Sequence, residues 1–212
     1  MIAMLWFRAA LVLLLLAGCD EMRRPQPRPE LPPGFVPSSG DPMRGVINAA
    51  AASFTNMAAP LQGQPVRAAQ AVAQLEALAD QVETNARWRN LPPGLGHALR
   101  LAREEERNAL GAKQDVPPRE LIQALGRAAQ ALGRNDEAGA AAALPARLFT
   151  PGGEETLRAL SRLGPLPAGE QATAALAREV ARLDAEGGWE GGGGWTQTGP
   201  AGAITDGLGL GY

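Results

Sequence analysis

The hydrophobic and polar positions divide the chain into four successive segments. An uninterrupted apolar run covers residues 9–18, and a proline-rich stretch covers 23–34. From 41 to about 186, apolar residues recur at the spacing of amphipathic α-helices. Glycine dominates the remainder. We therefore predict four parts: a leader over 1–18, a spacer over 19–40, a folded domain over 41–186 and a flexible tail over 187–212.

The folded segment is predicted to be all-α. β-branched residues are few in it, and no alternation of apolar and polar residues is long enough for a strand. Asn90 and Asp115 each precede a proline pair, which indicates a helix N-cap and a first helical turn. Gly111 and Gly133 suit the ends of these two helices. We predict an alanine- and leucine-rich bundle of about six helices, with helical segments near 42–59, 65–86, 90–111, 115–133, 135–144, 152–163 and 168–184.

The apolar run at residues 9–18 has the length of the hydrophobic region of a signal peptide. It is shorter than the roughly 20 residues that a membrane-spanning helix requires, and Arg8 precedes it. The run ends at Leu16-Ala17-Gly18-Cys19, which resembles the lipobox of bacterial lipoprotein precursors. This resemblance implies cleavage before Cys19 and acylation of that residue. The alternative is an ordinary secretory leader in which Cys19 is incidental.

Cys19 is the only cysteine of the chain, so its acylation would leave no thiol for a disulfide or a metal site. Two or more acyl chains give stable membrane anchoring, whereas one chain is marginal. The resemblance therefore implies a lipid-anchored protein of the cell membrane or the outer membrane, with its domain facing the periplasm. Asp20 follows the cysteine and resembles the inner-membrane retention signal of some enteric bacteria.

The stretch after the cysteine is predicted to be a spacer. Its dense prolines fix φ and remove backbone donors, which favours polyproline II over helix or sheet. Over residues 20–41, about 3.1 Å per residue gives a reach on the order of 70 Å. A proline-rich recognition ligand is the alternative interpretation. At the other end, residues 187–212 contain too much glycine to become ordered without a partner.

Charge and residue types exclude several function classes. The formal net charge is −2, which favours neither a nucleic-acid partner nor a strongly basic membrane-binding surface. His97 is the only histidine, so a histidine-rich metal site is excluded and any Ser-His-Asp triad would depend on this residue. A structural histidine is the preferred interpretation. We expect no cofactor, no metal and no enzymatic activity.

The candidate contact site is Arg87-Trp88-Arg89 together with Arg100. A tryptophan flanked by guanidinium groups can stack on a flat ligand or lie at an interface. The alternative is that Trp88 plugs one end of the bundle. The charged stretch at 100–107 is predicted to be a solvated helix face, braced by Arg100–Glu104 and Glu104–Arg107 pairs.

Residues 88–125 are similar to uncharacterised exported proteins of Gram-negative bacteria, and this resemblance implies no activity. We predict a membrane-anchored envelope lipoprotein that acts as a non-catalytic interaction or assembly module. Its partners would be membrane lipid, through acylated Cys19, and a protein of the cell envelope. Two alternatives are a small-ligand-binding lipoprotein with a pocket near Trp88 and an envelope enzyme that depends on His97.

Overall fold

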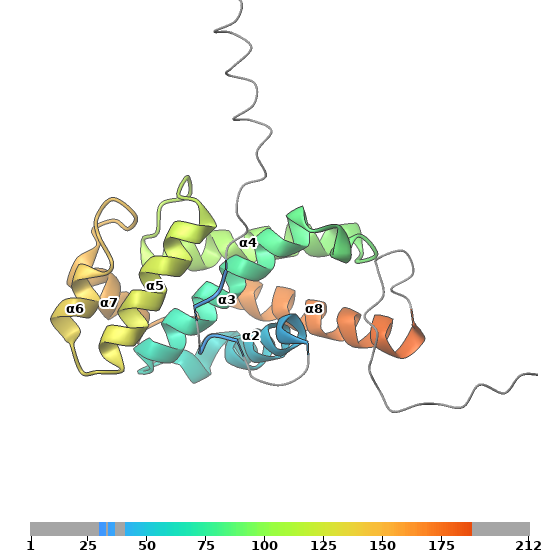
Figure 1. Cartoon of the computed structure of the whole chain (residues 1–212), viewed down its shortest axis with the longest axis horizontal. Coiled ribbons are helices and arrows are strands. Elements are labelled where there is room, and N and C mark those ends of the chain that lie inside the picture. Colours follow the sequence, from blue (N-terminus) through green and yellow to red (C-terminus); the bar gives the residue numbers. More distant parts are fainter. Residues whose placement is uncertain (1–29, 33, 37–40, 188–212) are drawn as a thin grey trace, which may run out of the picture.

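A computed structural model describes residues 30–32, 34–36 and 41–187. The predicted leader, Cys19 and nearly all of the glycine-rich tail lie outside these residues. Over the described residues the chain forms helices joined by loops (Figure 1), and its one β-type contact is a bridge between Ala112 and Phe149. The all-α prediction is confirmed. The α-helices are α2 (Pro42–Ala58), α3 (Pro65–Thr84), α4 (Pro93–Leu110), α5 (Pro118–Leu132), α6 (Glu137–Ala142), α7 (Gly153–Ser161) and α8 (Pro167–Glu186), and the short 3₁₀ helices are η1 (Ala59–Leu61) and η2 (Ala86–Trp88).

Helix α3 is the centre of the bundle. It packs against α2, α4, α5 and α7, while α8 packs against α2 and α4 on one side, and α6 joins α5 and α7 at one end (Figure 1). Twelve of the 20 residues of α3 are buried, as expected for a helix with neighbours all round. Six of these twelve are alanine, whose small side chain lets helices approach closely. Among the described helices, none is both long and apolar enough to cross a membrane.

Several helix ends agree with the prediction from the sequence, but two predicted N-caps do not. Asp41 caps α2, because its carboxylate accepts a hydrogen bond from the backbone N–H of Met43 at 3.0 Å. The predicted N-caps Asn90 and Asp115 are wrong, since Pro92 and Pro117 hold those positions. A proline pushes the residue before it into extended backbone, so in each Pro-Pro pair the first proline stays outside the helix and the second begins it.

Helix α2 loses helical geometry before its predicted end at residue 59. Asn56, Met57 and Ala58 have φ values of 51°, 54° and 67°, a left-handed conformation that residues with side chains rarely adopt in succession. Glu170 of α8 holds this turn, because its carboxylate accepts hydrogen bonds from the backbone N–H groups of Asn56 at 2.8 Å and Met57 at 3.0 Å. The turn thereby fastens the end of α2 to the start of α8.

Part of the predicted spacer belongs to the folded domain. Phe35 is 3% exposed and lies in the hydrophobic core, and Leu31 and Val36 pack against that core. The backbone carbonyl of Phe35 accepts a hydrogen bond of 2.8 Å from the buried Nε2 of Gln74 on α3. We call residues 30–32 and 34–36 the docked segment.

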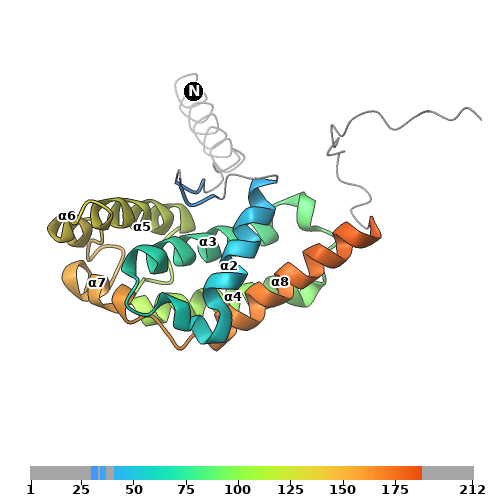
Figure 2. The same cartoon turned by 90° about the horizontal axis from the view of Figure 1, so that it is seen from below.

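The docked segment also contacts α5, and Figure 2 shows it beside the end of that helix. A Cβ atom at Gly126 would lie 2.6 Å from Cγ of Pro32, so the proline ring fits because this position of α5 has no side chain. The predicted boundary at residue 41 is therefore too late, because the docked segment already packs against the bundle. The dense prolines correctly predicted that this segment is not a helix. They did not prevent it from packing against the bundle.

Candidate functional site

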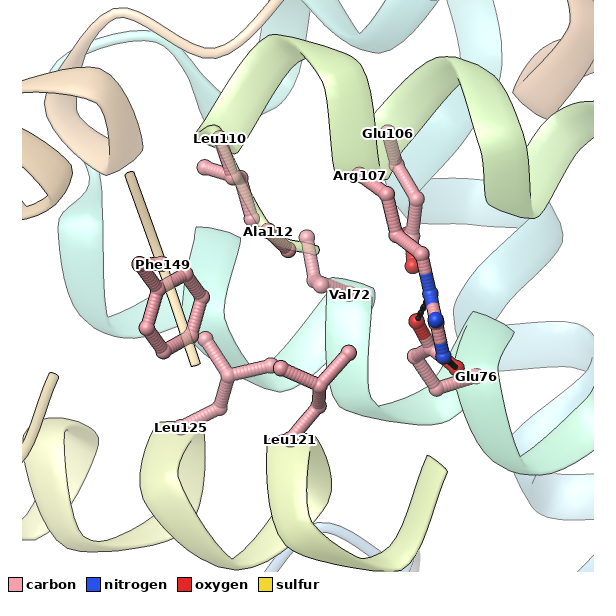
Figure 3. Close-up of a pocket in the computed structure, with 9 residues that line it drawn as sticks. All are labelled: Val72, Glu76, Glu106, Arg107, Leu110, Ala112, Leu121, Leu125 and Phe149. Carbon is pink, nitrogen blue, oxygen red and sulfur yellow. Dashed lines mark hydrogen bonds and ion pairs between the residues drawn. The ribbon is translucent and has the colours of Figure 1, made fainter. Parts of the chain in front are cut away.

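Three charged side chains meet in the core between α3 and α4 (Figure 3). Glu76 of α3 and Glu106 of α4 are 0% exposed, and Arg107 of α4 is 3% exposed. We call these residues the inner cluster. Charged groups are rarely buried unless they are paired and hydrogen-bonded, so the contacts of each member decide what the cluster can do.

Arg107 uses its guanidinium to join three parts of the molecule. Its Nε and Nη2 donate to the two carboxylate oxygens of Glu76 at 2.5 and 2.8 Å, which is a bidentate pair. Its Nη1 donates to the backbone carbonyls of Lys113, Gln114 and Val116 at 3.2, 2.9 and 3.0 Å. Arg107 therefore holds the loop between α4 and α5 in place and links that loop to α3.

The surroundings of Glu106 favour its protonated, neutral form. Burial raises its pKa well above the usual range, the neighbouring Glu76 carboxylate raises it further, and Arg107 and Arg103 act in the opposite direction. As a carboxylate, Glu106 has no donor to either oxygen among the described side chains and backbone. As a protonated acid it can donate a hydrogen bond to Glu76. The inner cluster then contains one positive, one negative and one neutral group.

The surroundings of the inner cluster are apolar and tightly closed. Figure 3 shows side chains from α3, α4, α5 and the segment around Phe149 meeting beside Arg107 and Glu106. The space between them is too narrow for a water molecule. The arrangement can hold one proton and fasten helices together. The apolar lining residues are Val72, Leu110, Ala112, Leu121, Leu125 and Phe149.

The prediction of a solvated charged face at 100–107 is wrong for its last two residues. Arg107 pairs with Glu76 rather than Glu104, and Arg100 pairs with Glu83 of α3 at 3.5 Å. A signal for this was present in the sequence. The buried positions of α4 recur every three or four residues, and position 106 falls in that series. The series is Leu95, Leu99, Ala102, Glu106 and Leu110.

Trp88 and Arg87, two of the predicted contact residues, make contacts within the bundle. Trp88 is 3% exposed, and the guanidinium of Arg87 covers its ring at 4.7 Å from the centroid. Arg87 also pairs with Asp41, the N-cap of α2. Burial alone raises the pKa of Asp41, but the hydrogen bonds from Arg87 and Met43 bring it below its usual range. This geometry matches the interpretation of Trp88 as a plug at the bundle end.

The structure does not gather the other predicted residues around the indole of Trp88. Arg89 is exposed, and its Nε lies 3.4 Å from the carbonyl oxygen of Ala86. Arg100 contacts Glu83 and approaches Nδ1 of His97 at 3.5 Å. His97 itself is exposed on α4. Cys19, the predicted lipid attachment site, lies outside the described residues.

No family model, curated protein or solved structure matches this chain. The similarity of residues 88–125 to exported proteins of Gram-negative bacteria therefore stays a prediction from the sequence. Within the described residues, no group of three or more His, Cys, Asp or Glu side chains could hold a metal ion.

Proposed function

We propose that this protein is a bacterial envelope lipoprotein, acylated at Cys19, whose helical domain is a non-catalytic interaction or assembly module at the membrane surface. The leader and the lipobox Leu16-Ala17-Gly18-Cys19 support the anchor. The observation that carries the rest of the proposal is the docking of Phe35 in the core, only sixteen positions after Cys19.

The docked segment shortens the distance that the tether can span. A spacer over residues 20–41 would reach on the order of 70 Å. Because Leu31 packs against the core and Glu30 directly precedes it, at most eleven steps separate Cys19 from Glu30. At about 3.1 Å per step, these reach about 35 Å. A lipid anchor at Cys19 would thus hold the bundle close to the headgroups, where a partner would also have to lie.

The bundle uses its most distinctive side chains internally, which favours an interaction module over the two alternatives. Arg87 covers the ring of Trp88 and pairs with Asp41, the N-cap of α2. Arg107 is bonded to Glu76 and to a loop. These residues would otherwise be the first candidates for holding a ligand. We therefore place the partner contacts of the bundle on its outer helix faces.

The test is metabolic labelling with radioactive palmitate. Wild-type protein should be labelled and cleaved, whereas Cys19→Ser should stay unlabelled and unprocessed. Asp20→Asn is the control, because it changes the neighbouring residue and leaves the acylated thiol in place. Equal labelling of wild type and Cys19→Ser would disprove the lipid anchor and with it the proposed function.

A further inference from the structure

Helix α5 carries a row of positive charge on its exposed face. Arg119, Gln123, Arg127 and Gln130 are exposed and spaced by four, four and three residues, so they lie along one side of the helix. Arg134 follows four residues after Gln130 in the turn that ends the helix, and it is also exposed. We call Arg119, Arg127 and Arg134 the arginine row.

The positions along this line of α5 carry arginine or glutamine, and Glu120, Asp136 and Glu137 are acidic residues near its members in the sequence. Glu120, on the flank of the row, lies 3.5 Å from Arg147, and Asp136 caps α6 through the backbone N–H of Gly139. Within the described part of the chain, the row forms no ion pair. Elsewhere in the described residues, a helix or the turn after it carries at most one arginine without an ion pair. These are Arg67 on α3, Arg89 after η2, Arg103 on α4, Arg162 after α7 and Arg178 on α8.

The docked segment lies on the flank of the same helix face. Gly126, which receives Pro32, immediately precedes Arg127 in the chain. Figure 2 shows the docked segment next to α5 and shows α8 on the opposite side of the molecule. The described chain therefore starts next to the arginine row, at Glu30, eleven positions after Cys19. A tether that starts here and reaches about 35 Å brings this side of the bundle nearest to the lipid.

We propose that the exposed face of α5 is a contact surface for anionic phospholipid headgroups. The guanidinium groups of the row suit phosphate oxygens, with which arginine forms paired hydrogen bonds. The net charge of −2 did not predict such a surface, because a net charge does not report which charges share a helix face. The proposal rests on the proposed function, since it requires the tether at Cys19.

The strength of the contact follows from the number of arginines. Each basic residue near an anionic membrane surface favours membrane binding by about fivefold. The three arginines of the row together therefore favour the bound state by a factor on the order of 100. Salt weakens the contact, because exposed charges are screened over about 10 Å at 0.1 M ionic strength. In the absence of anionic lipid, the tether keeps this side of the bundle nearest to the membrane, but nothing holds α5 against the headgroups.

The experiment uses full-length protein that the cell has processed, purified from membranes and reconstituted into vesicles. The only other thiol of the chain would be acylated, so Gln123→Cys on α5 and Gln171→Cys on α8 each introduce one fluorophore site. Quenching by a headgroup nitroxide is measured in phosphatidylcholine vesicles and in an equal mixture with phosphatidylglycerol. We expect strong quenching at position 123 only with phosphatidylglycerol, and weak quenching at position 171 in both.

Charge-matched variants separate the arginine row from total charge. Replacing Arg119, Arg127 and Arg134 with Gln should abolish the quenching at position 123. The control replaces Arg89, Arg162 and Arg178 with Gln, which removes the same charge from exposed positions elsewhere and should preserve the quenching. Circular dichroism confirms that each variant is folded.

The outcomes distinguish this inference from the proposed function. Protein that does not float with vesicles after purification lacks the anchor, and the proposed function fails. Protein that floats but shows equal quenching at positions 123 and 171 in anionic vesicles keeps its anchor, and only the lipid-contact surface is disproved. The same conclusion follows if both triple variants lose quenching equally.

Discussion

Arginine occupies two opposite settings on neighbouring helices of this bundle. Arg107 on α4 is 3% exposed, and its donors are bonded to Glu76 and to three backbone carbonyls. Arg119 and Arg127 on α5 are exposed and form no ion pair with the described carboxylates. A buried charge must be satisfied inside the fold, whereas an exposed one stays available to a partner. Whether an arginine lies on the buried or the exposed face of its helix, rather than its residue type, decides which of the two settings it occupies.

The largest effect should come from breaking the inner cluster. Arg107→Met leaves the buried Glu76 without its cation and removes a donor from three carbonyls, so we expect a loss of about 3–5 kcal/mol in unfolding free energy. The matched control is Arg158→Met, which removes one partner of an exposed pair with Glu155 and should cost about 0–1 kcal/mol. Urea unfolding measures both. Equal losses would show that burial does not distinguish the two arginines.

The docked segment offers the second test, because it contributes interior contacts beside the exposed row. Phe35→Ala removes a ring that is 3% exposed, and we expect a loss of about 3 kcal/mol in unfolding free energy. Leu31→Ala, at a half-buried position, is the control and should cost less. An unchanged melting temperature for Phe35→Ala would show that the docked segment does not contribute to the stability of the domain and belongs to the spacer.

The inner cluster should also give the protein a distinctive pH dependence. The pKa of Glu106 is raised in the folded state, so its contribution to stability is complete below the unfolded pKa near 4.3. That contribution is lost as the pH rises through the folded pKa, by up to about 1.4 kcal/mol per pH unit for one proton. Glu106→Gln imitates the neutral acid. It should remove this slope and unfold like wild type at low pH.

The control for that pH dependence is Glu154→Gln, an exposed position at the start of α7. It should keep the wild-type slope above pH 4.5. If Glu106→Gln also kept the slope, the proton would not reside in the inner cluster.

A smaller effect is expected from Glu105, next to the inner cluster on α4. Its Oε2 accepts a hydrogen bond of 3.0 Å from the backbone N–H of Gly169, near the start of α8. Glu105→Ala removes a carboxylate from a helix N-terminus and should cost about 1 kcal/mol. The exposed neighbour Glu104→Ala should cost almost nothing. Thermal melts that reverse this order would contradict the contact between α4 and α8.

Much of the fold could be predicted from the sequence, because apolar residues at helical spacing report one buried face per helix. Gly111 ends α4 with φ of +69°, and a Cβ there would lie 2.3 Å from the carbonyl oxygen of Thr150. Asp136 accepts a hydrogen bond from the backbone N–H of Gly139 and caps α6, near the predicted start of that helix. Local patterns were sufficient for these features.

The other features depend on contacts between distant parts of the chain. The sequence around Phe35 is typical of a spacer, and only contacts with distant residues such as Gly126 and Gln74 make it part of the core. Glu106 stands in a run of charges, so local composition indicated a solvated face. Glu76, the partner of Arg107, lies 31 positions before it, beyond any local pattern. Arg87 pairs with Asp41, which lies 46 positions earlier and could not be predicted locally.

The most direct test of the comparison is the unfolding free energy of the variant in which Arg119, Arg127 and Arg134 are all replaced with Gln. Because these side chains are exposed and without ion pairs in the described structure, we expect a value within about 0.5 kcal/mol of wild type. Arg107→Met should lose several kcal/mol under the same conditions. A comparable loss in the triple variant would contradict the account, because the arginine row would then be needed for the fold.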